Sequence, residues 1–533
     1  MTYVSFSFSH RLFAYFCGIL VYSLDDADLP MLKKYLLKLK HSITNAAFEE
    51  MHEGWGGEYH SLKTVKSRVS TLADLPSESH DCCINICVCF AGPYEGDQVC
   101  PKCKESRLDD RSKPRAKYHY FPFIPRLQAY YNNASTKELL QYHAQFDSEE
   151  TYQSDNIRDV FDGSIYRSLL GREVEVDGRK LGVKYFSDAW DIALSMSTDG
   201  FSPFDHSSST TWPIILFNLN LPPEVRVHVE EVLCVGLVPG PRKPKDFDSF
   251  LFPLVEELAK LSVGVRTWDA EAAEFFTLRA HLILASGDTL AVSMLMNMKG
   301  ANSYCPCRMC TATSVSDPAT SSTTLYLPLS PSHMHPGRID YDPLSLPLRS
   351  HDSFISQSRL VATAPSRVQR ERLARECGIK GESIFYKLPT IEFPLSFPTD
   401  FMHLIFENVL QTLVSLFGGD IKGMEQDVFV ILKKKWEDLG RATVACGASI
   451  PSCFGSRPPN FVENRQQCTV DSWSFWLLYL APILLDDCLP SAHYRHFVRF
   501  SELVGECLQF EMPKERLPGL RRDFAEWVQN FEK

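Results

Sequence analysis

The chain has 533 residues, of which 44% are hydrophobic and 23% are charged. This composition excludes an intrinsically disordered protein, and the length allows roughly two to four domains with cores of their own. The net charge of −11 argues against binding nucleic acid through total charge. A local basic patch would be enough, however, and short basic runs occur at Lys33-Lys34, Arg242-Lys243 and Lys433–Lys435, although most such runs are only solvated surface.

The first apolar stretch of the chain is Leu12 to Leu24. It could be the core of a signal peptide, but a single Arg precedes it and no small-x-small cleavage site follows, so we interpret it as a buried helix. This run and Phe475–Leu485 are both too short to span a bilayer, and we expect no association with a membrane.

Changes in composition and periodicity divide the chain into segments. The stretch 311–390 is rich in Ser, Thr and Pro and shows little periodicity, which is typical of a long insertion or linker. We expect a helical segment over 1–75, a zinc-ribbon-like module over 76–120, a connector over 121–189, the first part of a mixed α/β core over 190–300, an insertion over 301–397, a core helix over 398–420 and a helical region over 421–533.

The Cys-rich stretch contains two pairs of cysteines at metal-ligand spacing. Two pairs of thiolates at such spacing can close a tetrahedral Zn²⁺ site, and a structural site has four ligands. The 17 cysteines, an odd number gathered in clusters, favour metal binding in a reducing compartment over a disulfide framework. The predicted zinc ligands are Cys83, Cys87, Cys100 and Cys103, with Cys82 and Cys89 as substitutes.

Two predicted strands end at aspartates. Alternating apolar residues from Ile192 predict a strand that ends before Asp199, and alternation from Phe276 predicts another that ends before Asp288. Between them lie apolar runs over 212–221 and 232–238 and a stretch with helical spacing over 251–261. The order strand, strand, strand, helix, strand is the opening order of an RNase H-like sheet, so we predict a mixed α/β fold with an RNase H-like core.

A third acidic residue follows the insertion. Thr399 can cap a helix that begins near Asp400, and Asp400, His403 and Glu407 then share one face. A polar face of an ordinary surface helix has the same pattern. We predict Glu407 as the third catalytic acid, with Asp400 or Glu392 as substitutes, and His403 as the side chain that orients it. With Asp199 and Asp288, these hard oxygen ligands suit two Mg²⁺ or Mn²⁺ ions in an enzyme that cuts phosphodiesters.

A second cysteine group stands inside the predicted insertion, at Cys305-Pro306-Cys307-Arg308-Met309-Cys310. One Cys-x2-Cys pair is half of a zinc site. Cys307 and Cys310 could bind a second zinc together with His333, His335 or His351, or they could be free thiols.

Several motifs together resemble transposases of CACTA (En/Spm-type) DNA transposons, in particular the Plavaka-like group of fungal genomes. The matching stretches are Asp81–Cys87, Cys100–Cys103, Phe121–Tyr130, Val160–Gly163, Ser197–Phe201, Trp212–Ile214, Asn218–Pro223, Val238–Pro241, Phe252–Leu258, Gly300–Cys310 and Asp400–His403 with Glu407-Asn408. They occur in family order and span roughly 80–525.

The resemblance implies a nuclear cut-and-paste DDE transposase that acts as a homo-oligomer on transposon terminal repeats and target DNA. Asp199 and Asp288 match the first two acids of the family and Glu407 best matches the third. Family proteins run on beyond the point where this chain stops, so we expect a truncated helical region. An inactive or host-adopted relic that only binds DNA or protein is therefore the alternative function, and an unrelated zinc-stabilised scaffold is a third interpretation.

Overall fold

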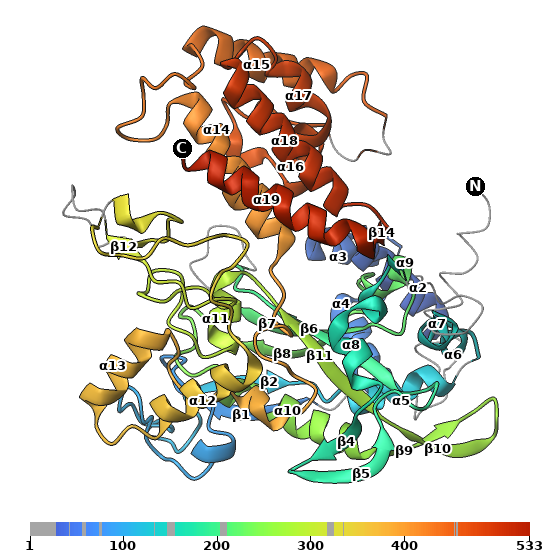
Figure 1. Cartoon of the computed structure of the whole chain (residues 1–533). Helices are drawn as coiled ribbons and strands as arrows, with labels where there is room; N and C mark the ends of the chain where they lie inside the picture. The colour runs from blue at the N-terminus through green and yellow to red at the C-terminus, as the bar shows by residue number, and fades with distance from the viewer. Residues whose placement is uncertain are drawn as a thin grey trace.

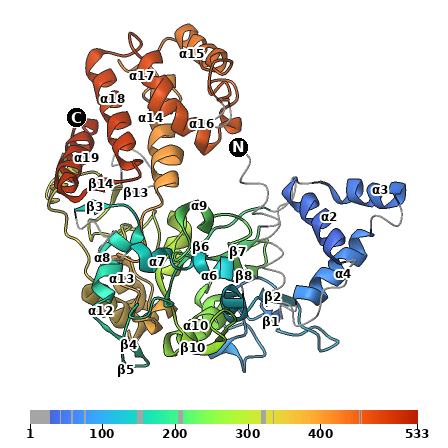
Figure 2. The same cartoon turned by 90° about the vertical axis from the view of Figure 1, so that its right-hand side faces the viewer.

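The structure is a computed structural model that describes residues 28–41, 43–55, 60–73, 77–132, 134–146, 155–202, 210–316, 325–333, 335–451, 454 and 457–533. The apolar run Leu12–Leu24 lies outside these residues. A mixed sheet occupies the centre, and a layer of C-terminal helices lies above it (Figure 1). The N-terminal helices project to one side (Figure 2).

The central sheet has six strands in the order β1-β2-β8-β7-β6-β11. β6 and β11 are parallel, and every other pair of neighbours is antiparallel. The strands are β1 (Glu78–Cys82), β2 (Ala116–Tyr120), β6 (Ile192–Thr198), β7 (Trp212–Asn218), β8 (Leu233–Val238) and β11 (Ala280–Ser286).

The two strands that precede Asp199 and Asp288 are direct neighbours in the sheet. Ser286 of β11 stands opposite Ser197 of β6 in a parallel register. Because parallel neighbours end on the same side of a sheet, both aspartates leave the sheet at one end. Gly287 fits between the two strand ends, because a Cβ there would lie 2.6 Å from the carbonyl oxygen of Thr198.

The prediction of a single strand from Phe276 to Leu284 is wrong. The chain forms two strands there, β10 (Glu274–Leu278) and β11, and β10 pairs with β9 (Val265–Asp269) in a hairpin outside the sheet. β11 is buried or half-buried along its whole length, because α10 (Asp248–Val263) covers one of its faces. A strand covered on both faces carries apolar residues on both, so alternation does not mark its ends.

The main hydrophobic core lies between the sheet and α10. Phe250, Leu251, Leu254 and Leu261 of α10 are completely buried in the same cluster as the inward side chains of β6, β7, β8 and β11. α11 (Thr289–Leu295) joins this core through Ala291, Val292 and Leu295. The spacing that predicted a helix over 251–261 therefore marks the buried face of α10.

The cysteine module is built into the sheet. Its flanking segments form β1 and β2, and β2 pairs with β8. The module also contacts the start of α10, where the backbone N–H of Asp246 donates to Cys87 O (2.9 Å) and that of Cys89 donates to Ser249 Oγ (2.8 Å). Composition alone predicted a module here but did not show that its strands extend the core sheet.

The insertion contains helices that the sequence analysis did not predict. α12 (His351–Ala362) begins with a reciprocal capping box between Ser350 and Ser353, and α13 (Arg367–Cys377) is capped by Ser366. Gly378 ends α13 in a left-handed conformation with φ of 76°. These caps were readable signals, but the richness in Ser, Thr and Pro obscured them.

Helices α2 (Asp28–Lys40), α3 (Asn45–Trp55) and α4 (Leu62–Ala73) form an N-terminal unit around a small core of their own. Its buried side chains come from all three helices and include Leu32, Phe48 and Val65. Arg68 of α4 pairs with Asp28 at the start of α2 (2.6 Å) and fixes the two helices relative to each other.

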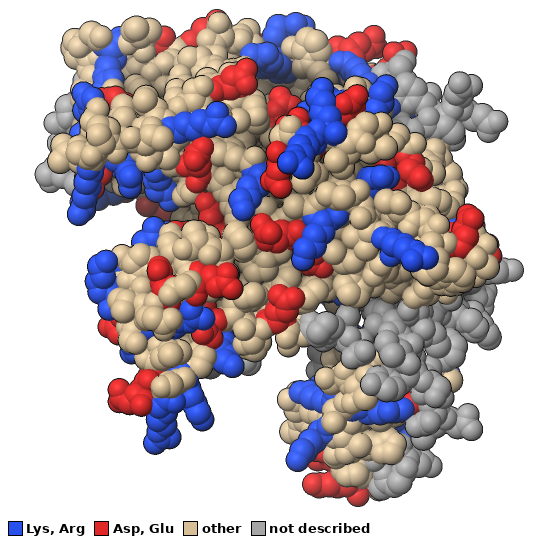
Figure 3. Space-filling view, turned by 90° about the horizontal axis from the view of Figure 1, so that it is seen from below, with Lys and Arg blue, Asp and Glu red and all other residues tan. Residues whose placement is uncertain are grey.

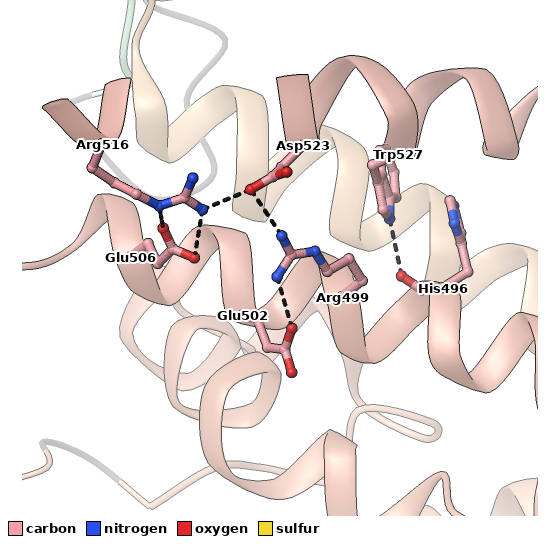
Figure 4. Close-up of polar contacts among 7 residues, drawn as sticks. All are labelled: His496, Arg499, Glu502, Glu506, Arg516, Asp523 and Trp527. Carbon is pink, nitrogen blue, oxygen red and sulfur yellow. Dashed lines mark hydrogen bonds and ion pairs between the residues drawn. The ribbon is translucent and has the colours of Figure 1, made fainter. Parts of the chain in front are cut away.

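The C-terminal helices pack around a second large core. α19 (Leu517–Phe531) lies on α18 (Ser491–Cys507) through a chain of ion pairs, in which Arg516 binds Glu506 (2.8 Å) and Asp523 (2.6 Å) and Arg499 also binds Asp523 (2.9 Å) (Figure 4). The Trp527 indole donates to the carbonyl of His496 (3.0 Å). Partly exposed ion pairs add little stability, so their effect here is to orient α19.

α19 also contacts the insertion. The Glu532 carboxylate accepts a hydrogen bond from the backbone N–H of Leu329 (2.9 Å), and Arg521 donates to the carbonyl of Leu344 (2.9 Å). Just before α19, β14 (Met512–Pro513) pairs with β3 (Asn156–Ile157) of the connector. The C-terminal helices are thus attached to the core at two places besides the chain connection.

The remaining elements are short or lie at the periphery. They are α5 (Ile124–Ala129), α6 (Ala134–Leu139), α7 (Tyr142–Phe146), α8 (Ser164–Leu169), β4 (Glu173–Val176), β5 (Arg179–Lys184), α9 (Pro223–Arg226), β12 (Val315–Ser316), β13 (Leu325–Tyr326), α14 (Leu410–Gly418), α15 (Lys433–Cys446), α16 (Val470–Phe475) and α17 (Ala481–Leu484). No helix in the described part of the chain is long and apolar enough to cross a bilayer.

Replacement of Gly287 by Ala should destabilise the core. The added Cβ would meet the Thr198 carbonyl oxygen at 2.6 Å and the Ala291 Cβ at 2.8 Å, at a φ of 157°. We expect a loss of about 1–3 kcal/mol in the free energy of unfolding, measured by urea denaturation. Gly178→Ala is the matched control, because Gly178 also has a positive φ (75°) but no atom within 4 Å of the new Cβ. Equal losses in the two variants would contradict the packing argument.

Candidate functional site

The acidic face predicted after the insertion is present. A π-helix (Met402–Val409) continues into α14, and its N-terminal end is held by Asp400, whose carboxylate accepts a hydrogen bond from the backbone N–H of His403 (3.1 Å). The sequence analysis gave this capping role to Thr399. Ile405 is buried in the C-terminal core, so the opposite face of the helix is the one available to a site. π-Helical turns are often found at functional sites.

His403 lies between two carboxylates on this face. Its Nδ1 is 3.0 Å from Asp400 Oδ2, and its Nε2 is 3.6 Å from Glu407 Oε2. Burial lowers the pKa of His403, but the contact with Asp400 and the charges of Asp400, Glu407 and Asp199 outweigh it, so the pKa is raised. The raised pKa couples the imidazole to Asp400 and Glu407 and to the charge of Asp199 at the end of β6.

The segment before the helix runs along the outer edge of β11. The backbone N–H of Ala285 donates to Ser396 O (2.8 Å), and the Thr390 hydroxyl donates to Leu282 O (2.5 Å). Because Ala285 is near the end of β11, this edge contact brings the following residues to the end of the sheet where Asp199 and Asp288 lie. Tertiary contacts, and not proximity in sequence, bring the start of the helix to this end of the sheet, where the charge of Asp199 acts on His403.

Arg308 of the second cysteine group holds the same segment. Its guanidinium donates to the carbonyl of Phe397 (3.1 Å) and to that of Pro398 (3.0 Å). These carbonyls immediately precede Asp400, so a side chain of the insertion fixes the start of the acidic helix. The sequence analysis missed this role, and no local pattern around Arg308 could have revealed a contact so distant in sequence.

Asp199 and Asp288 each bind the backbone that follows them. The Asp199 carboxylate accepts from Gly200 N (2.6 Å), and the Asp288 carboxylate accepts from Ala291 N (2.6 Å) and thereby caps α11. Asp199 is exposed and Asp288 is half-buried. The side-chain oxygens of Asp199, Asp288 and Glu407 do not all lie within 4.8 Å of one another. They share one end of the sheet without forming a closed set of ligands.

The two substitutes for the third acid differ in position. Asp400 contacts His403, as described above, whereas the charge of Glu392 acts on His351 at the start of α12. Of the two, Asp400 is the one that shares the face of Glu407.

The four predicted zinc ligands converge. The sulfurs of Cys83, Cys87, Cys100 and Cys103 all lie within 4.8 Å of one another, and Cys83 Sγ is 3.4 Å from Cys103 Sγ. Four sulfurs at ~2.3 Å from a central Zn²⁺ are ~3.8 Å apart, so the set fits a structural zinc site. The substitutes Cys82 and Cys89 are buried in the main core of the sheet instead.

The thiols of this set are surrounded by hydrogen-bond donors. The Asn85 N–H donates to Cys83 Sγ (3.4 Å) and its side-chain amide donates to Cys103 Sγ (3.6 Å). Burial raises the pKa of Cys103, but hydrogen bonds from the Glu105 backbone and from Asn85 lower it to about 6. Burial raises the pKa of Cys83 and that of Cys87, so the low pKa that favours the thiolate required for metal binding belongs to Cys103 and not to these two thiols.

The second cysteine group has no complete set of ligands. Among the residues that the structure describes, no third Cys, His, Asp or Glu completes a compact set with Cys307 and Cys310. His335 contacts Ser316 O (2.5 Å), and His351 Nδ1 accepts from Phe393 N (3.0 Å). The loop is held instead by Arg349, which donates to Cys305 Sγ (3.0 Å) and to the carbonyls of Cys307 (3.1 Å) and Cys310 (3.2 Å). This arrangement favours the interpretation as free thiols.

Comparison with known families gives one match. The model of the Transposase family tnp2 matches residues 176–330. The match supports a transposase family for this chain. The matched region contains Asp199, Asp288 and the second cysteine group, and it ends before the helix that carries Glu407. A search of curated proteins finds no significant match.

The structure predicts one zinc ion per chain. Cys100→Ser should abolish zinc binding, because a closed structural site needs all four ligands, and it should destabilise β1 and β2. The double change Cys307→Ser with Cys310→Ser is the matched control and should keep the zinc. Elemental analysis of the purified proteins measures the molar ratio of zinc to protein chain. A ratio of two that falls to one in the control would show that the second cysteine group also binds metal.

His403 should stabilise the protein more at low pH. Its pKa is raised above the usual 6.5, so its contribution is complete below about pH 6.5 and is lost as the pH rises through the raised value. The difference in the free energy of unfolding between the unchanged protein and His403→Gln, without added divalent ions, should be larger at about pH 6 than at about pH 9. A difference that does not vary with pH would contradict the ion pairs with Asp400 and Glu407.

Proposed function

We propose that this chain is a DNA transposase of the cut-and-paste type, related to the CACTA (Plavaka-like) group, with an RNase H-like DDE core. The observation that carries the proposal is the position of Asp199 and Asp288 at the same end of two parallel neighbouring strands, with the acidic face of the π-helix at that end. The match to the Transposase family tnp2 over 176–330 supports it independently.

The topology of the sheet supports an RNase H-like core. The first three predicted strands are β6, β7 and β8, joined as antiparallel neighbours, and the fourth, β11, returns parallel to the first. The helix α10 provides the crossover to β11. An RNase H-like core places its first acid on strand one and its second just after strand four, as Asp199 and Asp288 are placed here.

The carboxylates of Asp199, Asp288 and Glu407 would hold two Mg²⁺ or Mn²⁺ ions. Carboxylate oxygens are the preferred ligands of these hard cations, and Asp199 and Glu407 are both exposed. Such ions supply an activated attacking water and stabilise the leaving 3′ oxygen of a phosphodiester. Because the three carboxylates are not within 4.8 Å of one another, we propose that they close together when ions and DNA bind.

His403 and Asp400 would position Glu407. The imidazole contacts both carboxylates and so limits the rotamers of Glu407 on the exposed face of the helix. In its charged form it would also reduce the mutual repulsion of Asp400, Glu407 and Asp199 before cations bind. Arg308 would keep the start of the helix in place.

The partners that follow are transposon terminal repeats and target DNA, with a homo-oligomer and the nucleus as further parts of the proposal. The zinc site would have a structural role, because it is closed by four cysteines and joined to the core sheet through β1 and β2. The alternative is a DNA- or protein-binding relic without catalysis.

The test is metal-dependent nicking of transposon-end DNA by the unchanged protein and by three variants. Asp199→Asn, Asp288→Asn and Glu407→Gln keep the shape of each side chain but remove its charge. Each should abolish nicking in Mg²⁺ and Mn²⁺, with a loss of at least about a hundredfold, while zinc content and unfolding midpoint stay unchanged. Gels of a labelled duplex measure the nicked product.

Glu392→Gln is the matched control and should keep activity, because its charge acts on His351. If Glu407→Gln stays active while both Asp changes are inactive, Asp400 becomes the third acid. If the unchanged protein binds DNA but nicks none in any divalent metal, the relic function replaces the proposed one.

A further inference from the structure

Four cations from three segments that are distant in sequence lie beside the cysteine module between β1 and β2, which is called the zinc module below. They are Arg242 and Lys243 in the loop between β8 and α10, Lys299 after α11 and Lys380 after α13, and all four are exposed. We refer to them as the Lys380 cluster. We propose, on the basis of the transposase function above, that the Lys380 cluster binds the phosphate backbone of duplex DNA.

Backbone contacts hold two of the three segments of the cluster together, those of Lys299 and Lys380. Met298 and Ile379 form an antiparallel bridge, in which Lys299 N donates to Gly378 O (2.8 Å) and Lys380 N donates to Asn297 O (2.7 Å). The side chain of Asn297 also donates to Asp248 at the start of α10 (3.0 Å) and to the Glu382 carbonyl (2.8 Å). The cluster is therefore fixed by the fold and is not a chance meeting of flexible side chains.

The nearby carboxylates are already engaged. Asp246 accepts a hydrogen bond from Tyr94 (2.7 Å) and pairs with Lys102 of the zinc module (3.2 Å). Glu382 pairs with Arg359 (3.4 Å). Asp248 binds Asn297, as above, and burial together with the charge of Asp246 raises its pKa to about 8. The positive charge of the cluster is thus only partly balanced.

The cations also repel one another. Lys380 is exposed as a whole residue, but partial burial of its ammonium group lowers its pKa. The charges of Asp248 and Asp246 raise this pKa and those of Lys243 and Lys299 lower it further, so that the net pKa is lowered. Like charges held together by the backbone without a full complement of anions fit a ligand with closely spaced negative charges. Duplex DNA carries one phosphate charge per ~1.7 Å of its axis.

Two of the three segments of the cluster leave the same end of the sheet as the aspartates. β8 runs antiparallel to β7, as does β6, so the loop with Arg242 and Lys243 begins at the end where Asp199 lies. Lys299 follows α11, which Asp288 caps. On the face seen from below, Lys and Arg side chains stand on both sides of the indentation between the zinc module and the part of the insertion that carries α13 (Figure 3).

Arg242 links the cluster to the zinc module. Its guanidinium donates to the side-chain oxygen of Asn85 (2.9 Å), and the amide of Asn85 donates to Cys103 Sγ. The zinc module thereby supports one wall of the proposed backbone-binding surface. Arg242 is left unchanged in the test below, because its replacement would also disturb the cysteine site.

The test measures binding of a fluorescein-labelled duplex of mixed sequence by anisotropy, over a range of salt concentrations and without added divalent ions, so that cleavage plays no part. The triple change Lys243→Ala, Lys299→Ala and Lys380→Ala should weaken binding about tenfold or more. The triple change should also reduce the slope of the logarithm of the binding constant against the logarithm of the salt concentration by about 2–3 in magnitude. The reason is that each phosphate contact contributes about 0.9 to this slope.

The matched control is Arg179→Ala, Lys180→Ala and Lys184→Ala, which removes three exposed cations from β5. It should leave the slope unchanged, and Lys→Arg at the three cluster positions should retain binding. Equal zinc content in all variants checks folding. A cluster variant with an unchanged slope, or a control variant with an equal loss, would overturn the inference and leave the proposed function standing. An unchanged protein that binds no duplex would overturn both.

Discussion

The parallel pairing of β6 with β11 is the constraint on which the candidate site depends. Parallel neighbours require a long crossover. Here β7, β8, α10 and the β9–β10 hairpin come between the two strands in the sequence, although the strands are adjacent in the sheet. The return in the same direction brings the ends of both strands to one side. Asp199 and Asp288 are far apart in sequence but leave the sheet together, and the missing side chain of Gly287 lets the two ends approach.

The acidic helix joins two cores. Its apolar face, with Ile405 and Phe406, belongs to the C-terminal core, whereas on the other face the charge of Asp199 from the central sheet helps to raise the pKa of His403. The edge contact with β11 and the hydrogen bonds from Arg308 fix where the helix begins. A shift of the C-terminal helices would therefore move Glu407 relative to the aspartates.

The zinc module connects to the same sheet from the opposite edge. β1 and β2 extend it beyond β8, and the loop of Asp246 contacts the module before α10 begins. A closed zinc site would stiffen these outer strands. The four-cysteine set, the edge of the sheet and the Lys380 cluster are thus in contact with one another, although they come from separate parts of the sequence.

The sequence by itself determined the local features. The spacing of Cys83, Cys87, Cys100 and Cys103 predicted four converging thiols, and the period of two before Asp199 predicted a strand, because both depend on neighbours within a few residues. The sequence did not reveal the break at Arg279, because the alternation of apolar residues continues from Phe276 to Leu284 across the break between β10 and β11. The helices α12 and α13 begin with capping residues that could be recognised in the sequence. They were not predicted, because the segment is rich in Ser, Thr and Pro and was interpreted as a linker or insertion.

Only the tertiary structure decided what meets at the end of the sheet. Three of the contacts described above join residues that are far apart in the sequence. Arg308 contacts Phe397 and Pro398, and Arg349 contacts the second cysteine group. The backbone of Lys299 contacts the segment that carries Lys380. Local periodicity reports which face of an element is buried, but not which distant element covers it. That choice depends on how the sheet and the helices pack as a whole, and it sets the positions of His403 and Glu407 relative to Asp199.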